Sequence, residues 1–212
     1  MNAIRKCLLQ TLALAALLAL VAAPQARADN DQTVVLGAGI GIHEYSKVDA
    51  AREGDSSVGI DDVTHAGMSQ LYLEWYALGN VGFGIRTIGL GATRTTTILG
   101  VEIEEKYETS IPLITIQWVP IGATSYTRFG LIAGAGSADH SYTVTVGGSP
   151  SEVTASGSAT LAGAFLDWGG EDFGARFGVH SIDTDLGNYK DTTEPAEASG
   201  VAWYFDIRWA WK

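Results

Sequence analysis

The chain is poor in cysteine, proline and basic residues. Of its 212 residues only one is cysteine, Cys7, and 5 are proline. Because Cys7 lies near the start, at the edge of an apolar run, the remainder has no thiol for a disulfide or for binding a metal. Lysine and arginine total 13 against 24 acidic residues, which gives a formal net charge of −11. This negative balance argues against nucleic acid as a partner.

Long apolar runs are also missing beyond the first 28 residues, where no stretch approaches the roughly 18 apolar residues of a membrane helix. The start itself has a different pattern. Arg5 and Lys6 precede an apolar core over Leu8–Val21, and Ala26-Arg27-Ala28 forms a small-x-small site. These features predict a secretory signal peptide over residues 1–28. Cleavage would leave one domain over 29–212 and, with three basic residues removed, a formal charge of −14.

The last stretch, Val201–Lys212, alternates with a period of two. One face would carry only large apolar side chains, and the other would carry Asp206, Arg208 and Lys212 among small or aromatic residues. The apolar face consists of Val201, Trp203, Phe205, Ile207, Trp209 and Trp211. A tilted membrane-spanning strand needs about 9–11 residues, so this stretch is long enough to cross a bilayer.

Similar alternation recurs along the chain, with 26 glycines concentrated in the strands and turns. It predicts eight strands, at about 33–45, 67–78, 81–97, 102–119, 126–146, 152–168, 173–185 and 201–212. The connections after the second, fourth and sixth are short, whereas those after the first and seventh are long. The alternation of the third strand weakens beyond Ile88, so the sequence does not define its register there. Since only helices and closed barrels satisfy their backbone in lipid, we predict an all-β, eight-stranded, antiparallel, up-and-down transmembrane β-barrel.

Tryptophan placement supports this interpretation. Five of the six tryptophans lie shortly before a predicted short turn or the end of the chain: Trp75, Trp118, Trp168, Trp209 and Trp211. Indole rings prefer the boundary between hydrocarbon and water, so we expect them to form the periplasmic aromatic girdle. The alternative, a water-soluble sandwich with an aromatic core, gives no reason to gather the rings at one end of alternate strands.

With these features the chain resembles the small eight-stranded outer-membrane barrels: OmpA-like transmembrane domains, OmpX-type proteins and opacity-type porin-family proteins. The resemblance rests on the signal sequence, on glycine-rich strands such as residues 173–178, and on the aromatic final strand. It implies a location in the outer membrane of a Gram-negative cell envelope. It also implies insertion by the barrel-assembly machinery, with Trp209 and Trp211 in the place of the terminal aromatic signal.

The inward faces of the predicted strands carry seven charged residues. An eight-stranded barrel is only wide enough to be filled by side chains, and buried charges must be paired. We therefore predict a lumen charge network of Glu74, Arg86, Arg128, Asp167, Arg176, Asp206 and Arg208. Structural filling is the favoured interpretation, and a gated ion path or ligand site is the alternative.

Some small barrels that this chain resembles modify lipid A with a Ser/His pair, which makes His180-Ser181 with Asp183 and His140-Ser141 with Asp139 the catalytic candidates here. Neighbours on a strand point to opposite faces, so neither dipeptide forms such a pair within itself. No catalytic residues are predicted.

Residues 43, 44, 61, 62 and 65 match no metal-ligand pattern, and the glycines at 37, 39 and 41 lack the features of a phosphate loop, so we predict no metal and no cofactor.

A barrel scaffold hosts many activities, so function is less determined than fold. The first hypothesis is a monomeric, non-enzymatic outer-membrane protein that supports the envelope or interacts through external loops. Its expected partners are outer-membrane lipids, including lipopolysaccharide. A lipid-modifying enzyme resembling lipid A deacylases, and a narrow channel for small solutes or apolar molecules, are the alternatives.

Overall fold

The computed structural model describes residues 33–45, 65–77, 79–121, 127–170, 172–193 and 195–211. The predicted signal peptide at residues 1–28, together with Asp61 and Asp62 of the first long loop, lies outside these ranges. The described chain contains eight strands: β1 (Thr33–Tyr45), β2 (His65–Tyr76), β3 (Val81–Ile98), β4 (Val101–Ile121), β5 (Thr127–Val146), β6 (Ser149–Gly169), β7 (Phe173–Asp185) and β8 (Gly200–Trp211).

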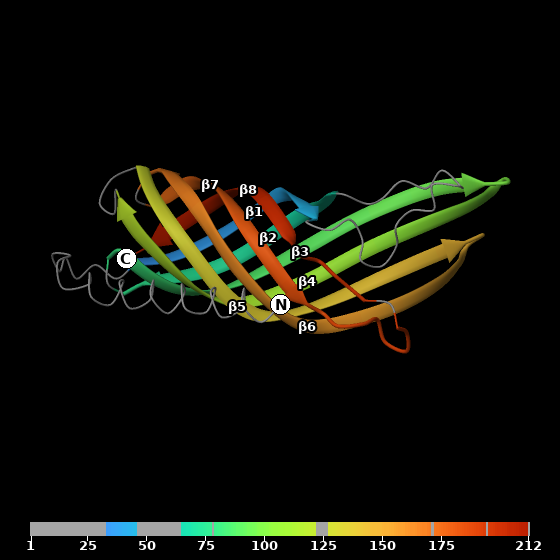
Figure 1. Ribbon diagram of the computed structural model, residues 1–212. Coiled ribbons are helices and arrows are strands. Elements are labelled where there is room, and N and C mark those ends of the chain that lie inside the picture. The colour runs from blue at the N-terminus through green and yellow to red at the C-terminus, as the bar shows by residue number, and fades with distance from the viewer. Residues whose placement is uncertain are drawn as a thin grey trace.

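Each strand pairs antiparallel with the next, and β8 closes the ring by pairing with β1. The result is a closed up-and-down barrel (Figure 1). The predicted fold is therefore confirmed. The largest differences from the predicted bounds lie at β6, which begins at Ser149 rather than at 152, and at β4 and β2, whose ends shift by about two residues.

The outward face of the barrel is apolar and the inward face carries charge, the reverse of a water-soluble protein. Ile114 is 74% exposed and Ile40 is 72% exposed, whereas Glu74, Asp167 and Asp206 are fully buried. A contiguous belt of exposed large apolar side chains marks a surface that contacts lipid. No helix in the part of the chain described by the structure is long and apolar enough to span a membrane.

Strands β3 to β6 continue far beyond the other four and form a curved sheet that projects from one end of the barrel (Figure 1). We call this the hairpin end and the opposite end, where β1 begins and β8 finishes, the terminal end. Two-residue turns close both projecting hairpins, at Leu99-Gly100 and Gly147-Gly148, and all four residues have positive φ. Positive φ at both central positions matches the right-handed twist of paired strands.

The register of β3 and β4 is continuous from Val81 opposite Trp118 to Ile98 opposite Val101. The alternation weakens in the sequence beyond Ile88 because the outward residues of β3 are no longer large and apolar there: Gly89 and Gly91 are followed by Thr93, Thr95 and Thr97. The same alternate residues of β3 face outward along the whole strand. What changes is the environment of this outward face, which passes from the apolar belt to polar surroundings.

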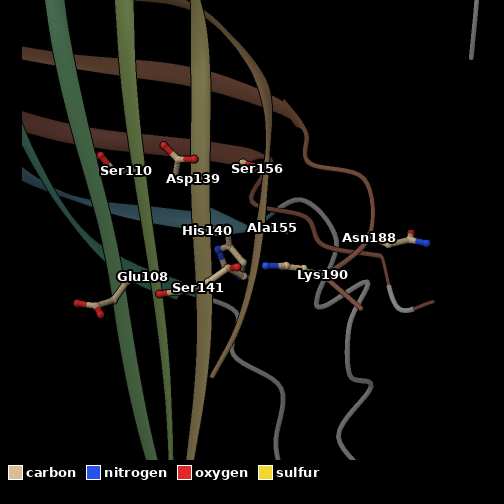
Figure 2. A pocket seen from close by; sticks show the side chains of 10 residues that line it. Glu108, Ser110, Asp139, His140, Ser141, Ala155, Ser156, Asn188 and Lys190 are labelled. Carbon is tan, nitrogen blue, oxygen red and sulfur yellow. The ribbon is translucent and has the colours of Figure 1, made fainter. Parts of the chain in front are cut away.

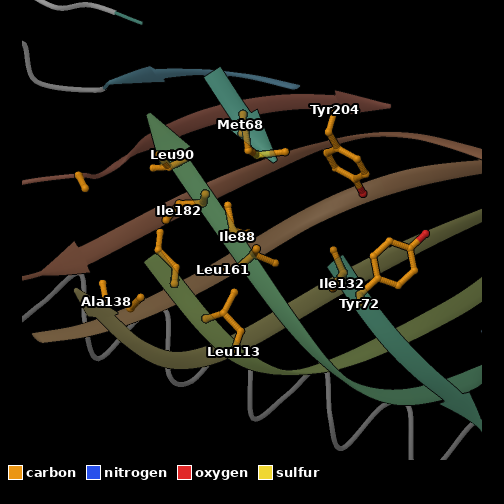
Figure 3. Packing of buried hydrophobic residues seen from close by; sticks show 14 of the residues in the cluster. Met68, Tyr72, Ile88, Leu90, Leu113, Ile132, Ala138, Leu161, Ile182 and Tyr204 are labelled. Atoms are coloured by element: carbon orange, nitrogen blue, oxygen red, sulfur yellow. The ribbon is translucent and has the colours of Figure 1, made fainter. Parts of the chain in front are cut away.

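Apolar side chains fill the half of the lumen toward the hairpin end (Figure 3). They include Ile88, Leu113, Ile132, Leu161 and Ile182, each at most 4% exposed. This layer lies next to the charged residues of the other half. The interior of the barrel is therefore packed with side chains over much of its height, as expected for a ring of eight strands.

Candidate functional site: the polar interior

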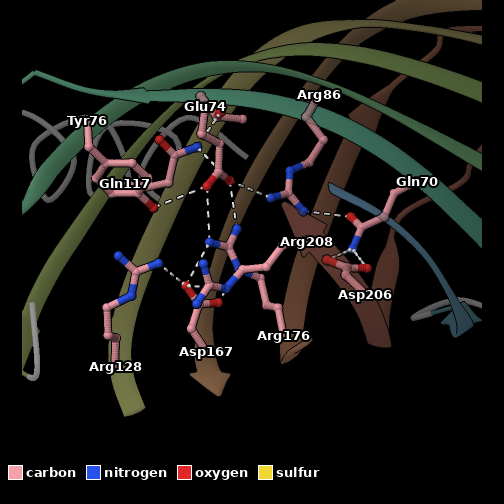
Figure 4. Close-up of polar contacts among 11 residues, drawn as sticks. Gln70, Glu74, Tyr76, Arg86, Gln117, Arg128, Asp167, Arg176, Asp206 and Arg208 are labelled. Carbon is pink, nitrogen blue, oxygen red and sulfur yellow. Dashed lines mark hydrogen bonds and ion pairs between the residues drawn. The ribbon is translucent and has the colours of Figure 1, made fainter. Parts of the chain in front are cut away.

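Glu74 on β2 is the centre of the charged half of the lumen (Figure 4). Its carboxylate accepts hydrogen bonds from Arg176 Nη1 and Nη2 at 2.7 and 3.0 Å, and from Arg86 Nη2 at 3.0 Å. Gln117 Nε2 and the Tyr76 hydroxyl also donate to it, at 3.3 and 3.1 Å. Two guanidinium groups and two neutral donors thus satisfy a carboxylate that is 0% exposed.

Asp167 on β6 is a second carboxylate centre. Arg176 Nε donates to its Oδ1 at 2.6 Å, and Arg128 Nη2 donates to its Oδ2 at 2.7 Å. Arg208 Nε lies 3.6 Å from Oδ2 and forms an ion pair. Because Arg176 contacts both Glu74 and Asp167, it joins the two centres across the lumen.

Asp206 on β8 joins the network through an amide. Gln70 Nε2 donates to both Asp206 oxygens, at 2.7 and 2.9 Å, and Gln70 Oε1 accepts from Arg86 Nη1 at 2.6 Å. A continuous path of polar contacts therefore runs from Asp206 through Gln70, Arg86, Glu74 and Arg176 to Asp167. The structure brings all seven residues of the predicted charge network into this one connected group.

Aromatic rings cover the faces of the two central guanidinium groups. Arg176 Cζ lies 3.9 Å from the centroid of the Phe165 ring, and Arg86 Cζ lies 4.3 Å from that of Tyr72. A guanidinium group that pairs with carboxylates at its edge and packs against rings at its face replaces much of its hydration with these contacts. This geometry offsets part of the desolvation cost of burying the two guanidinium groups.

Strand β1 contributes no charge to the network and instead makes room for it. A Cβ at Gly37 would overlap the Tyr72 ring, and one at Gly39 would overlap the Asp206 carboxylate. The close approach of these side chains to the β1 backbone therefore requires glycine at both positions.

Three neutral residues of the network were missed from the sequence: Gln70, Gln117 and Tyr76. Gln70 and Tyr76 share the parity of Glu74 on β2, so the period-two pattern placed them inside. They were missed because the predicted network contained only charged residues, and these side chains are neutral.

A separate polar cluster lies on the inner face of the projecting sheet. Arg94 on β3 donates through Nε to Glu105 Oε2 at 2.8 Å and forms an ion pair with the same oxygen, while the Tyr142 hydroxyl donates to Oε1 at 2.5 Å. Nearby, His140 Nδ1 lies 2.8 Å from Thr109 Oγ1 and Nε2 lies 3.0 Å from the Tyr189 hydroxyl. Burial lowers the pKa of His140 to about 4, so the ring is neutral at pH 7.

The structure separates the members of both His-Ser dipeptides. His180 is fully buried while Ser181 is exposed, and His140 is buried while Ser141 is half-buried on the opposite face. Both ring nitrogens of His140 are engaged by Thr109 and Tyr189 rather than by a serine. Within the ranges described, no group of three or more His, Cys, Asp or Glu residues is arranged to hold a metal ion.

The five tryptophans of the predicted girdle lie at the terminal end of the barrel. Val34 is opposite both Trp75 and Trp211, Thr127 is opposite Trp168, and Phe173 is opposite Trp209. Trp118, opposite Val81, completes the set. Four of the rings are 46–69% exposed, and Trp118 is half-buried.

No protein-family model and no curated protein matches the chain in sequence. Solved structures do match its fold. A major outer membrane protein from Thermus thermophilus superposes with a TM-score of 0.55 and 8% identity, covering 85% of this chain and 100% of that one. Ail, the attachment invasion locus protein of Yersinia pestis, superposes with a TM-score of 0.51 and 10% identity, over 85% of this chain and 97% of its own.

A second structure of Ail, in complex with the heparin analogue sucrose octasulfate, gives a TM-score of 0.52 at 9% identity over the same shares of the two chains. At these identities the likeness shows the fold alone. The chain thus has the architecture of the small eight-stranded outer-membrane β-barrels.

Proposed function

We propose that this chain is a non-enzymatic outer-membrane protein whose barrel anchors the projecting sheet of β3 to β6 at the cell surface, where it supports the envelope or contacts other molecules. The observation that carries this proposal is the contrast between the two parts. The barrel interior is occupied by paired charges and apolar side chains, whereas the projecting sheet presents a polar surface beyond the apolar belt. By the usual asymmetry of such barrels, the hairpin end is external and the terminal end is periplasmic.

The proposal includes the route to the membrane. Residues 1–28 act as a cleaved signal peptide, and the barrel-assembly machinery inserts the mature barrel as a monomer among outer-membrane lipids. The five girdle tryptophans would then lie at the periplasmic boundary of the bilayer, with lipopolysaccharide around the hairpin end. Mass spectrometry of the protein extracted from outer membranes tests the first step, because cleavage predicts a mature start at residue 29.

The surface charge indicates what the projecting sheet would not bind. Its exposed acidic residues are Glu102, Glu108, Asp139 and Glu152, against one exposed lysine on the same strands, Lys106. Ail has been solved with a sulfated heparin analogue. A sulfated glycan would meet repulsion on the sheet of this chain, so we expect its partners to be neutral or cationic.

Shortening one hairpin tests the surface role. Replacing residues 93–106 by an Asn-Gly turn would join Ala92 to Tyr107, which already lie opposite each other, and leave the barrel intact. In cells that lack the native gene, we expect the shortened protein to fold and yet to leave the envelope defect uncorrected, measured as entry of a large antibiotic. Full correction by the shortened protein would contradict the surface role.

Two further measurements separate the alternatives. The paired lumen predicts no stepwise conductance in planar bilayers, and opening events of the wild-type protein would favour a channel.

A non-enzymatic role predicts the same lipid A mass spectrum with and without the protein. A new lipid A species that depends on the protein would instead favour a lipid-modifying enzyme.

A further inference from the structure

A cavity of about 530 Å³ lies on the projecting sheet, where β4, β5 and β6 meet the chain that follows β7 (Figure 2). Six polar side chains of the three strands line it: Glu108, Ser110, Asp139, Ser141, Thr154 and Ser156. None of the seven charged residues of the lumen network lines it.

The strand register explains why these side chains converge. Ser110 lies opposite Asp139, which lies opposite Ser156, and the next row runs from Glu108 through Ser141 to Thr154. Residues opposite each other on neighbouring strands project on the same face, about 5 Å apart. The cavity floor is therefore two adjacent rows of three polar groups, at a spacing comparable with the width of a sugar ring.

The chain after β7 supplies one side of the cavity and is fixed in place. Lys190 donates its backbone N–H to the Thr154 carbonyl at 2.8 Å, so this segment pairs with the edge of β6 beyond the end of β7. Asn188 and Lys190 line the cavity, and in Figure 2 the lysine side chain extends toward His140 and Ser141. The site thus combines hydroxyls, carboxylates, an amide and an ammonium group from four segments.

This set of groups suits a polyhydroxylated ligand. A sugar hydroxyl both donates and accepts. Serine and threonine hydroxyls and an amide can serve it in either sense, and carboxylates accept from it. The two carboxylates exceed the single ammonium in charge, which disfavours phosphate or sulfate. Among the described residues that line the cavity, His140 alone carries an aromatic ring, so an apolar or planar ligand would gain little from it.

The height of the cavity fits the polar zone of a bilayer. Ile114, a large outward apolar residue of β4, lies four residues after Ser110 along the strand, on the side of the apolar belt. Four residues at about 3.3 Å each, on a strand tilted by about 40°, place Ser110 about 10 Å from Ile114 along the membrane normal, toward the hairpin end. The polar headgroup region of a bilayer begins in this range.

We propose that this cavity binds an uncharged part of the saccharide headgroup of a glycolipid in the surrounding leaflet. This inference rests on the proposed outer-membrane location and specifies which lipid chemistry the surface contacts. A weak site is sufficient, because a glycolipid confined to the same leaflet is present at high effective concentration. A free glycan would offer the same hydroxyls without that advantage.

Amide chemical shifts of the isotope-labelled protein in phospholipid nanodiscs test the proposal. We expect nanodiscs that contain lipopolysaccharide with its core saccharide to shift the amides of Ser110, Asp139, Ser141 and Ser156. Lipid A without the core should leave them unchanged, and the released core oligosaccharide should shift them only at high concentration. Absence of a shift with intact glycolipid, or equal shifts with lipid A alone, would overturn the proposal. Tight binding of the free oligosaccharide with no glycolipid effect would overturn the membrane source.

A substitution that fills the cavity provides the matched comparison. Ser156→Leu should raise the half-saturating glycolipid content by about tenfold or more, equivalent to about 1.4 kcal/mol. Thr95→Leu, on the outward face of β3 away from the cavity, should leave it unchanged. If Ser156→Leu does not fold, Asp139→Ala serves the same purpose. Unchanged saturation in a folded cavity variant contradicts the proposal, whereas failure of the wild-type protein to enter nanodiscs would count against the outer-membrane role itself.

Discussion

At the scale of single residues, Glu74 holds the lumen together because it accepts from two buried guanidinium groups at once. Glu74→Gln keeps the shape of the side chain but removes the carboxylate that forms ion pairs with Arg86 and Arg176 in a closely packed interior. Removing one partner of a buried pair costs about 3 kcal/mol or more. We expect a loss of about this size in the free energy of unfolding, measured by urea titration in lipid vesicles.

The control for this experiment is Glu102→Gln, which removes the same charge from an exposed position on β4. Exposed substitutions change stability by about 0.5 kcal/mol or less. Equal effects of the two variants would mean that the lumen pairing contributes nothing specific.

Glycines of the barrel provide a second comparison between residues of one type. Gly39→Ala would place a methyl group against the Asp206 carboxylate and the Phe205 carbonyl, whereas a Cβ at Gly91 meets nothing within 4 Å. Overpacking a filled interior costs about 1–3 kcal/mol. The folded fraction, followed by the gel-mobility shift between heated and unheated samples, should fall for Gly39→Ala and not for Gly91→Ala. A folded, unimpaired Gly39→Ala barrel would show that the lumen can relax around this position.

Alternation along a strand predicts which charged residues point inward, because successive side chains lie on opposite faces. It did not identify their partners. Glu74 and Arg176 are 102 positions apart in the chain and meet across the lumen. Their contact depends on the stagger between strands that closes the barrel, and no local pattern encodes that stagger.

At the scale of elements, the eight strands were predictable to within a few residues because both faces alternate strictly inside the membrane. The sequence defines the lengths of the projecting hairpins less sharply. Beyond Gly91 the outward positions of β3 are threonines, so the contrast between the two faces disappears although pairing continues to Ile98. Gly147-Gly148 gives a recognisable turn signal, whereas Leu99 adopts positive φ without one.

One segment, residues 186–193, is held against the projecting sheet by the contact of Tyr189 with His140 and by the hydrogen bond from the Lys190 N–H to the Thr154 carbonyl. Its attachment should depend on pH. Burial lowers the pKa of His140 from 6.5 to about 4, so protons bind preferentially when the segment is detached and the ring is exposed. The stabilisation is complete above about pH 6.5 and is lost as the pH falls toward about 4. Thr109 and Tyr189 are the residues that hydrogen-bond to the ring.

Hydrogen exchange at the amide of Lys190, which donates to the Thr154 carbonyl of β6, measures this attachment. The free energy of local opening, corrected for the intrinsic exchange rate, should decrease between pH 7 and pH 4.5. His140→Gln should remove most of this pH dependence. The same dependence in that variant would assign it to another group.

At the scale of the whole molecule, the distribution of polarity decides the environment of the barrel. Ile207 lies on the lipid-facing side of β8, midway between Trp203 and Trp211, which are eight residues apart. At the rise and tilt of a barrel strand this separation is about 20 Å along the membrane normal, close to the height of an apolar belt. Ile207 is therefore placed near the middle of the bilayer.

Ile207→Arg tests this assignment of the outward face to lipid. An arginine on the lipid side at the midplane costs about 2–4 kcal/mol in barrel stability. Thr95→Arg makes the same kind of change on the outward face of β3, but beyond the apolar belt, where the side chain meets water or polar headgroups. Folding titrations in phosphatidylcholine vesicles should therefore show a loss for Ile207→Arg and little change for Thr95→Arg. If both variants were equally stable, and the wild-type protein stayed monodisperse without detergent or lipid, the outward apolar belt would not be a membrane surface.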